Sequence, residues 1–435
     1  MRDNLDSLDA VIVGAGPAGC AAAYDLARAR RRVLLLDKRS FPRHKACACG
    51  LTRKTLQALR YSVEPVTERV CHEIVLQNNE EVRVRTRNPI CAMAVRERFD
   101  AFCLQQTLAA GAKLRKIEGI AALRELPMHI ELDIVTTDGT ETLRAPVLIG
   151  ADGSNGQTRR LAEVMKGTGF SSSVDAPHSR EPFASEGQPA WYTRGFALEA
   201  CVPYADLPAT LPGGAAPHDL VFDFSPLPGG YGWLFPKADH INIGVGAFAP
   251  DADDAQLRSV TRALLTEYAT RKLGVGTLAH GGLHITGQHL GMGGHTYTPR
   301  GRVLLTGDAA GLCDPLTGEG IHSAIVSGQA AAAAILEALP YPALKRTGFS
   351  PSVSANEKHG ALAPEGRLAG AYAHHLRPLQ QTLAFSHRAA LAFYREPERG
   401  FRAMRTPLLR SLILKTYADG VPQTRMIAAM AKWLV

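Results

Sequence analysis

The residues best suited to chemistry begin close to the amino terminus, in a segment rich in glycine. Gly14, Gly16 and Gly19 follow a short apolar run and precede a segment of helical composition. This spacing predicts a strand, a tight turn and a helix whose free amides can receive a pyrophosphate. A second apolar run ends at Asp37, whose carboxylate can take the hydroxyls of an adenosine ribose. The pattern predicts dinucleotide binding, and a glycine-rich turn without a ligand is the alternative.

Two later segments also carry residue types that contact ligands. Tyr231, Trp233 and Phe235 alternate along one stretch, which places their rings on one face of a strand. Such a stripe lines a ligand pocket or packs in a core, and both interpretations are open on spacing alone. Farther along, an apolar run ends at Gly307-Asp308. A Gly318-Glu-Gly320 turn then precedes a long segment of small residues that we expect to be a helix.

Separate motifs between residues 9 and 330 resemble those of the geranylgeranyl reductase family of FAD-dependent oxidoreductases. K-x-C-x-x-G-L, beginning at Lys45, is similar to the family's loop over the flavin ring, although an alanine and a cysteine stand where glycines are common. P-x-x-Y-x-W-x-F-P, beginning at Pro228, is followed by G-x-G as in the family. G-D-A-A-G-x-x-x-P-x-x-G-E-G-I begins at Gly307. Ala-Asp-Gly around Asp152 resembles the wider class of p-hydroxybenzoate-hydroxylase-like flavoproteins.

The resemblance implies that FAD lies between a Rossmann-like domain and a second lobe. The residues implied in cofactor binding come from the glycine-rich turn, the flavin loop and the later motifs: Gly14, Ala15, Gly16, Pro17, Ala18, Gly19, Asp37, Lys38, Lys45, Cys47, Arg96, Asp152, Gly307, Asp308, Pro315, Gly318, Gly320 and Ile321. The residues implied at the substrate are aromatic: Trp191, Tyr231, Trp233 and Phe235. No metal site is expected.

The resemblance also implies a reaction, in which reduced flavin N5 gives a hydride to a carbon of an isoprenoid double bond and a proton reaches the neighbouring carbon. The sequence leaves the proton donor open. The catalytic candidates are side chains that the family's architecture brings near the flavin or the substrate: Cys47, Cys49, Tyr231, Trp233 and His322, with His44 and water as further proton sources. On the same basis, Cys47 or Cys49 pairs reversibly with Cys313 or serves as a thiol near N5, and buried inert thiols are the alternative.

We expect an α/β fold (α+β overall), with a Rossmann-like FAD-binding domain, a mixed or antiparallel β-sheet substrate domain and a C-terminal helical region. The FAD-binding domain is expected to be discontinuous and formed by residues 1–68, 91–165 and 282–345. The substrate domain is expected at residues 69–90 and 166–281, where alternation of apolar and polar residues is typical of half-exposed strands. Residues 346–435 have an amphipathic, helical composition.

Charge and cysteine usage narrow the setting of the protein. The formal net charge is +8, and residues 356–435 alone carry 12 Lys and Arg against 5 Asp and Glu. This basic region is a solvated helical surface, or it contacts an anionic membrane surface or a diphosphate substrate. The first ten residues include acids and no hydrophobic segment, so we expect a cytoplasmic protein, with peripheral contact at the inner face of the membrane as a further expectation. Eight cysteines without a C-x-x-C pair indicate reduced thiols rather than a disulfide scaffold or a structural zinc site.

Two other functions share part of the motif set. A monooxygenase or halogenase acting on an aromatic substrate, and a flavoprotein that carries electrons to quinone, are the alternatives to a double-bond reductase. No second G-x-G-x-x-G accounts for a resident nicotinamide, so we expect NAD(P)H as a transient donor, or a reduced carrier protein. The expected partner is a hydrophobic small molecule and not a nucleic acid, and the sequence leaves the oligomeric state open.

Overall fold

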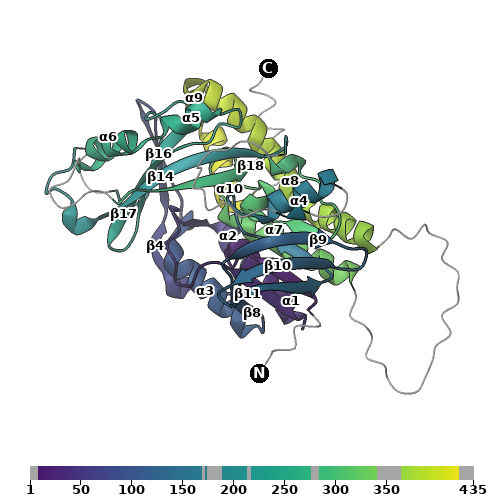
Figure 1. Cartoon of the computed structure of the whole chain (residues 1–435). Coiled ribbons are helices and arrows are strands. Elements are labelled where there is room, and N and C mark those ends of the chain that lie inside the picture. The colour runs from purple at the N-terminus through teal and green to yellow at the C-terminus, as the bar shows by residue number, and fades with distance from the viewer. Residues whose placement is uncertain are drawn as a thin grey trace, which may run out of the picture.

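The computed structural model describes residues 8–168, 172–173, 189–212, 217–275, 284–339 and 364–420. Parallel and antiparallel sheets are both present, helices separate runs of consecutive strands, and helices end the described chain (Figure 1). This arrangement confirms the expected mixed α/β fold class.

A five-stranded parallel sheet carries the glycine-rich turn. Its order is β19-β12-β1-β2-β8, with strands at Ala10–Val13 (β1), Val33–Asp37 (β2), Lys113–Lys116 (β8), Leu148–Gly150 (β12) and Val303–Leu305 (β19). β1 and β12 are buried along their whole length, as the apolar runs of a covered parallel sheet should be. Because parallel strands end at the same edge of a sheet, the segments that follow β1, β2, β12 and β19 gather there. Gly14, Asp37, Asp152 and Gly307 lie at these ends.

Three helices pack beside this sheet. α1 (Pro17–Arg28) follows the glycine-rich turn and packs closely against α7 (Ile321–Ala338). A Cβ at Gly328 would lie 2.2 Å from the backbone oxygen of Ala18, so this approach of the two helices requires glycine. α8 (Pro364–Arg395) also packs against α7, and its buried apolar residues belong to the same core as β1. The first long helix of the C-terminal region therefore contributes to the core of the nucleotide-binding half.

A seven-stranded mixed sheet forms the second lobe. Its order is β18-β14-β17-β16-β15-β5-β6, with strands at Glu73–Gln77 (β5), Glu81–Arg85 (β6), Thr193–Pro203 (β14), Leu220–Asp223 (β15), Gly230–Pro236 (β16), His240–Ala247 (β17) and Thr286–Met292 (β18). All neighbours are antiparallel except β15 and β5. β18 pairs with β14, so the sheet continues past residue 281, where the expected substrate range ends.

Two smaller sheets complete the strands. An antiparallel sheet of order β11-β10-β9-β13 contains Gly119–Glu125 (β9), Ile130–Thr136 (β10), Gly139–Ala145 (β11) and Ser172–Ser173 (β13). A three-stranded sheet of order β3-β7-β4 contains Gly50–Thr52 (β3), Thr67–Cys71 (β4) and Cys91–Ala94 (β7). β3 directly follows the K-x-C loop, so its pairing with β7 fixes one end of that loop.

The remaining helices connect these sheets or cover them. They are α2 (Arg53–Ala58), α3 (Arg96–Ala109), α4 (Thr158–Thr168), α5 (Asp254–Ser259), α6 (Arg262–Leu273), α9 (Pro397–Met404) and α10 (Pro407–Asp419), with short 3₁₀ turns at Glu64–Val66, Tyr204–Asp206, Gly294–Thr296 and Gly307–Ala310. Buried residues of α9 pack with Val82, and those of α10 join the aromatic core of the second lobe. The expected boundary at residue 346 lies outside the described residues.

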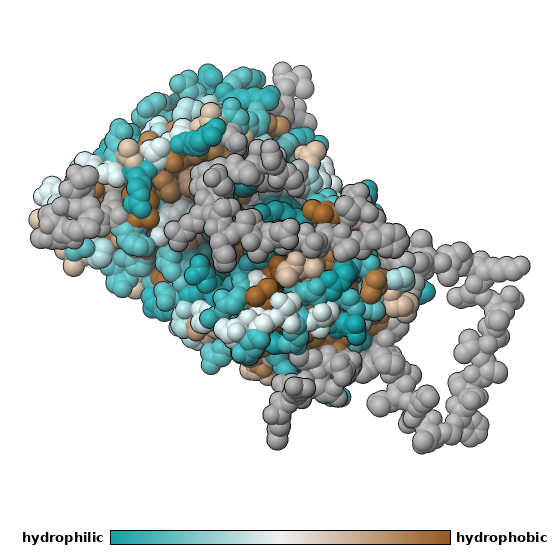
Figure 2. Space-filling view, in the orientation of Figure 1, coloured by the Kyte–Doolittle hydropathy of each residue, from teal (hydrophilic) through white to brown (hydrophobic). Residues whose placement is uncertain are grey.

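Among the described helices, α7 is long and apolar enough to cross a membrane when judged by length and composition alone. Of the window that meets this test, 56% is buried inside the protein. Its packing against α1 and α8 is that of a core helix, which meets the same criterion. Figure 2 shows one face of the molecule, which is mainly hydrophilic with hydrophobic residues in separate patches.

Candidate active site

One cavity of about 720 Å³ is lined by residues of both lobes. It brings together segments that are far apart in the sequence, including most of the residues that the motifs singled out. The predicted residues in its lining are Gly14, Gly16, Pro17, Ala18, Asp37, Lys38, Lys45, Cys47, Cys49, Arg96, Asp152, Tyr231, Trp233, Phe235, Gly307, Asp308, Gly318, Gly320 and Ile321. His44, a further proton-source candidate, also lines it. The predicted nucleotide, flavin and aromatic segments thus share one site.

Five predicted residues do not line this cavity. Ala15, Gly19 and Pro315 are absent from its lining. His322 faces Lys54 and Glu319. Trp191 packs its ring against Tyr192 and Tyr297, with ring centroids 5.7 and 5.1 Å away. Trp191 thus packs in an aromatic cluster just before β14 and outside this cavity, and its assignment to the substrate stays a prediction.

The glycine-rich turn has the geometry that its spacing predicts. Gly14 has φ of +102°, and a Cβ there would lie 2.3 Å from the backbone oxygen of Ala151. A Cβ at Gly19 would lie 1.8 Å from the oxygen of Gly14, so this glycine allows helix and strand to pack closely. Around Gly16, the nearest atom to such a Cβ is a guanidinium nitrogen of Arg43, 3.5 Å away. The backbone at Gly16 is therefore open toward the cavity, as a pyrophosphate requires.

Asp37 fixes this turn at the end of β2. One carboxylate oxygen accepts a hydrogen bond from the backbone N–H of Ala15 at 2.8 Å, and the other oxygen accepts one from the backbone N–H of Arg39 at 2.8 Å. The side chain still borders the cavity. Lys38, the next residue, donates to the side-chain oxygen of Gln157 at 2.6 Å. Burial lowers the pKa of Lys38, and Asp152 opposes that shift.

Two arginines of the cavity wall pair with Asp100, and Lys45 lies near them. Arg96 donates two hydrogen bonds to the Asp100 carboxylate, at 2.8 and 2.7 Å. Arg43 reaches the same carboxylate at 3.0 Å. Burial lowers the pKa of Lys45, and the positive charges of Arg96 and Arg43 lower it further. This positive wall suits a diphosphate. The motifs indicated Arg96 and Lys45 but missed Arg43, although it stands in the basic run before Lys45.

Asp152 organises the turn after β12. It accepts hydrogen bonds from the backbone N–H of Thr158, at 2.9 Å, and from the hydroxyl of the same residue. A Cβ at Gly156 would lie 2.1 Å from the carboxyl carbon of Asp152, so glycine is needed at that position. Burial raises the pKa of Asp152, although its hydrogen bonds act in the opposite direction.

Two buried ionisable residues of the second lobe, Glu199 and Lys237, hold the K-x-C loop. The backbone N–H of Cys47 donates to Glu199 at 2.7 Å, and the ammonium of Lys237 donates to the carbonyl of Ala48. Cys49 has φ of +48°, a left-handed conformation that favours glycine. The chain therefore keeps the backbone shape of a glycine-containing loop while placing a thiol there.

All eight cysteines are free thiols in this structure. Burial raises the pKa of Cys49 and of Cys313 well above the ordinary value, so both are neutral thiols. The Sγ atom of Cys47 accepts a hydrogen bond from the backbone N–H of Cys49 at 3.4 Å. Reversible pairing of Cys47 or Cys49 with Cys313 stays a prediction.

The aromatic stripe forms the cavity wall on the side of the second lobe. Tyr231, Trp233 and Phe235 lie on one face of β16, and Trp233 donates to the side-chain oxygen of Asn242 at 2.7 Å. The G-x-G of β17 makes room for these rings, since a Cβ at Gly244 would lie 2.0 Å from the indole of Trp233. Phe222, Phe248 and Tyr417, which the motifs did not indicate, also contribute aromatic rings to the lining.

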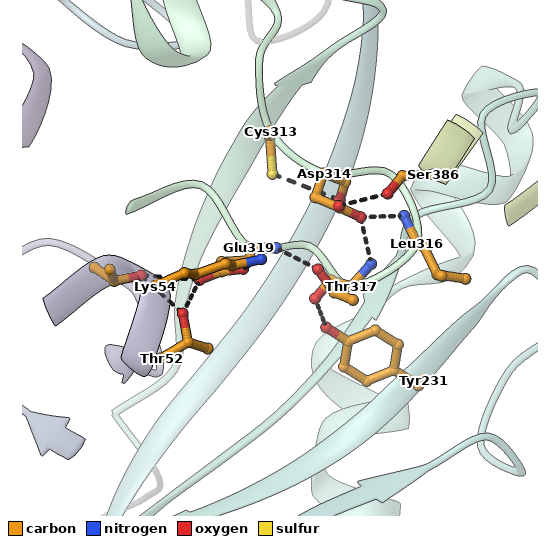
Figure 3. A network of polar contacts seen from close by, with 10 residues as sticks. Thr52, Lys54, Tyr231, Cys313, Asp314, Leu316, Thr317, Glu319 and Ser386 are labelled. Carbon is orange, nitrogen blue, oxygen red and sulfur yellow. Dashed lines mark hydrogen bonds and ion pairs between the residues drawn. The ribbon is translucent and has the colours of Figure 1, made fainter. Parts of the chain in front are cut away.

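The loop between the 3₁₀ turn at Gly307–Ala310 (η4) and α7 is held by contacts from three other segments (Figure 3). Asp314 accepts backbone hydrogen bonds from Leu316 at 2.9 Å and Thr317 at 3.1 Å, and accepts one from Ser386 of α8 at 2.8 Å. Tyr231 donates its hydroxyl proton to the carbonyl of Thr317. The position of the Gly318-Glu-Gly320 turn therefore depends on both lobes and on α8.

Glu319 ties this turn to α2. It lies 2.6 Å from the ammonium of Lys54 and accepts a hydrogen bond from Thr52 at 2.8 Å (Figure 3). Burial acts to raise the pKa of Glu319, but Lys54, His322 and the hydrogen bond from Thr52 together outweigh burial, and the pKa is lowered. Burial and the same lysine lower the pKa of His322 to about 4, so this imidazole is neutral.

The cavity has the features that FAD requires. An open glycine-rich turn and a cationic wall lie at one end, and Asp308 lies near the helix that begins at Ile321. Burial raises the pKa of Asp308, with Lys45 opposing the shift, so its carboxyl is poised to hydrogen-bond a hydroxyl. A Cβ at Gly320 would lie 3.3 Å from Asp308, so glycine keeps this corner open. The residues present therefore fit the cofactor.

Comparison with known proteins agrees with this geometry. Residues 7–185 match the family described as FAD binding domain. The chain is 29% identical over 343 residues to menaquinone reductase of Mycobacterium tuberculosis, covering 75% of this chain and 76% of that protein. It is 27% identical over 349 residues to geranylgeranyl diphosphate reductase of Rhodobacter capsulatus, covering 78% and 79%.

Solved structures show the same fold. A geranylgeranyl bacteriochlorophyll reductase-like protein from Thermoplasma acidophilum superposes with a TM-score of 0.61 at 19% identity, covering 89% of this chain and 90% of the other. A flavin-dependent brominase gives 0.62 at 15% identity, covering 94% and 93%. The fold is therefore common to reductases and halogenases.

Site and comparisons together define an FAD-dependent oxidoreductase. Relatives of the chain within that class include proteins named geranylgeranyl diphosphate reductase and digeranylgeranylglycerophospholipid reductase, which confirms the resemblance drawn from its motifs.

Proposed function

We propose that this protein reduces carbon–carbon double bonds of an isoprenoid or another hydrophobic substrate, with reduced FAD supplying the hydride from flavin N5. The observation that carries the proposal is the continuity of one cavity from the glycine-rich turn to the aromatic wall of β16. The names of related proteins support it, since they refer to geranylgeranyl diphosphate and menaquinone. Each of these compounds contains an isoprenoid chain.

The protein's own residues bind and orient the reactants in this proposal. The open backbone at Gly16 and the cationic wall of Arg43 and Arg96 hold the diphosphate, and Asp37 holds the ribose. Asp308 and the amino-terminal end of α7 hold the flavin end, where the helix dipole favours negative charge. The wall of the cavity opposite the nucleotide end consists of aromatic rings. These rings favour a hydrophobic substrate and exclude water from its double bond.

We also propose an electron donor and a location, both on the basis of the sequence. The donor in this proposal is NAD(P)H bound transiently, or a reduced carrier protein, because the sequence holds a single G-x-G-x-x-G. The protein is placed in the cytoplasm, with peripheral contact at the inner membrane face. The excess of lysine and arginine after residue 355 supports that contact, since basic segments are attracted to anionic lipid surfaces.

The test is an anaerobic half-reaction. The FAD-loaded protein is reduced with dithionite and mixed with geranylgeranyl diphosphate, prenylated lipids and menaquinone in turn. Flavin absorbance follows reoxidation, and mass spectrometry follows the product. We expect at least one substrate to oxidise the flavin and gain two hydrogens per event.

Other outcomes would assign a different function. A hydroxylated or halogenated product formed only with oxygen would identify a monooxygenase or halogenase. Oxidation of the flavin by menaquinone, with both hydrogens on the quinone ring and none on the side chain, would identify an electron carrier to quinone. Either result would refute double-bond reduction.

A further inference from the structure

One carboxyl group enters the cavity from the second lobe, where the motifs predicted only aromatic residues. Glu199 lies in the middle of β14 and is 6% exposed. Strand alternation places it on the same face as Ala197, and both residues line the cavity. Its antiparallel partner on β17 is Gly244, which has no side chain to cover it. Glu199 therefore stands on the floor of the cavity beside the indole of Trp233.

The contacts of Glu199 join the K-x-C loop to the aromatic wall. One oxygen accepts the backbone N–H of Cys47 at 2.7 Å. Asn242 hydrogen-bonds to the same carboxyl group and also accepts the indole N–H of Trp233 at 2.7 Å. The group is thus fixed between the loop that the family resemblance places over the flavin and the rings proposed to hold the alkene.

The other acidic residues of the cavity lining have different tasks. Asp37 fixes the glycine-rich turn, and Asp152 caps the start of α4. Glu319 pairs with Lys54 and its pKa is lowered, so its carboxyl group is ionised and cannot donate a proton. Asp308 lies at the end of β19, beside the turn that leads to α7. Glu199 is the acidic lining residue contributed by the seven-stranded sheet, opposite the parallel-sheet edge.

Three of the proton donors suggested by the sequence are less suitable. The hydroxyl of Tyr231 already donates a hydrogen bond to the carbonyl of Thr317, and burial raises the pKa of this hydroxyl well above the ordinary value. Burial has the same effect on Cys49, which makes that thiol a weak acid. His322 does not line the cavity and is neutral. A protonated carboxyl group is a stronger acid than any of these neutral groups.

From this position we infer that Glu199 is the proton donor of the reaction, an inference that rests on the proposed function. One alkene carbon receives the hydride with its electron pair from reduced flavin. The carboxyl O–H bond of Glu199 breaks, and its proton forms the new C–H bond at the adjacent carbon. The flavin is oxidised, the alkene is reduced, and the carboxylate of Glu199 takes a new proton from water.

The surroundings of Glu199 allow it to hold that proton. Burial raises its pKa above the ordinary value, while Cys47, Asn242 and the positive charges of Lys237 and Arg96 act in the opposite direction. The thiol of Cys201, on the same strand face, is a further titratable neighbour. General acids function best when their pKa is near the working pH, and burial of a carboxyl group is one way to achieve this.

Glu199→Gln is the test variant, because glutamine still offers an oxygen to the N–H of Cys47. Lys237→Gln is the matched control, since it alters the other buried anchor of the same loop. Three quantities are measured for each protein: FAD affinity, the single-turnover rate of isoprenoid reduction by dithionite-reduced enzyme, and the infrared absorption of protonated carboxyl groups without substrate. The infrared measurement does not depend on activity.

We expect Glu199→Gln to bind FAD like the unaltered protein, to lose one protonated-carboxyl band, and to reduce the isoprenoid about 100-fold more slowly or worse. Lys237→Gln should keep the band.

An unchanged rate in Glu199→Gln, or the absence of a protonated band in the unaltered protein near neutral pH, would overturn the role of Glu199 and leave the proposed function standing. Equal loss of FAD affinity in both variants would instead assign Glu199 to loop anchoring alone. Failure of the unaltered protein to reduce any isoprenoid would overturn both proposals.

Discussion

The substitution Gly244→Ala should disturb the aromatic wall without touching the nucleotide end of the cavity. A Cβ at this position would lie 2.0, 2.4 and 2.5 Å from three atoms of the Trp233 indole. Real atoms do not approach so closely, and the ring must move. That movement breaks the 2.7 Å hydrogen bond from Trp233 to Asn242, which is buried.

The cost can be estimated from these two effects. Overpacking a core costs about 1–3 kcal/mol, and a lost hydrogen bond costs about 0.5–1.5 kcal/mol. The free energy of unfolding should therefore fall by about 2–4 kcal/mol. For 435 residues the entropy of unfolding is about 0.9 kcal/mol/K, so the midpoint of thermal unfolding should fall by about 2–4 °C.

Gly370→Ala is the matched control for this substitution. Gly370 lies in α8 and is exposed, and a Cβ there would meet no atom within 4 Å. Alanine is the better helix former by about 1 kcal/mol, so this variant should unfold at a slightly higher temperature. Thermal unfolding and FAD binding are measured for both. If Gly244→Ala unfolds at the same temperature as the unaltered protein, the packing of Trp233 over β17 is refuted.

Three further substitutions test other parts of the site. Gly14→Ala should abolish FAD binding, measured by flavin absorbance after purification, because of the positive φ and the 2.3 Å clash. Glu319→Gln should cost about 3–5 kcal/mol of unfolding free energy at neutral pH, because it leaves Lys54 buried and unpaired. Since the folded pKa of Glu319 is lowered, the stability that it contributes is present above pH 4.5 and lost as the pH falls further, and this loss should be absent from the variant. Arg53→Ala breaks the pair with Asp419, at 2.8 Å, and should speed hydrogen exchange in α10 while costing at most about 1 kcal/mol.

Two of these substitutions, Gly14→Ala and Arg53→Ala, have a matched control. Gly111→Ala has a positive φ but no neighbour within 4 Å, so it should keep FAD. Arg395→Ala removes an exposed pair with Asp251 and should leave exchange in α10 unchanged. Retention of FAD by Gly14→Ala, a midpoint of unfolding for Glu319→Gln equal to that of the unaltered protein, or unchanged exchange in Arg53→Ala would contradict the corresponding contact.

Local patterns predicted those parts of the site that depend on neighbours in sequence. The turn at Gly14 follows from three glycines between a strand and a helix. The shared face of Tyr231, Trp233 and Phe235 follows from strand alternation, although alternation did not say whether that face met a ligand. Parallel strands end at one edge, so the convergence of Asp37 and Gly307 also follows.

The remaining contacts arise between residues that no local pattern connects. Glu199 and Lys237 reach the K-x-C loop from 152 and 189 residues away. Each looks like an ordinary charged residue within or beside a strand. Their role depends on the orientation of the seven-stranded sheet under the loop. For Trp191 the sequence predicted a contact with substrate that the structure does not show. An aromatic residue just before a strand can face a cavity or pack with another ring, and nothing in the local pattern indicated the contact with Tyr297.

The C-terminal region shows why an amphipathic helix is hard to place. Its apolar stripe showed that one face would be buried, but not against which partner. In the structure, α8 packs against α7 and hydrogen-bonds through Ser386 to Asp314, so it supports the loop at the flavin end. α10 covers the aromatic end and contributes Tyr417 to the cavity.

The central claim is that one cavity holds both FAD and an isoprenoid chain. The most direct measurement is the number of double bonds reduced for each flavin oxidised, in a single anaerobic turnover with geranylgeranyl diphosphate or menaquinone. We predict a ratio of one, with two hydrogens gained by the isoprenoid chain. Flavin that stays reduced with every such substrate, or a protein that binds no FAD, would contradict the claim.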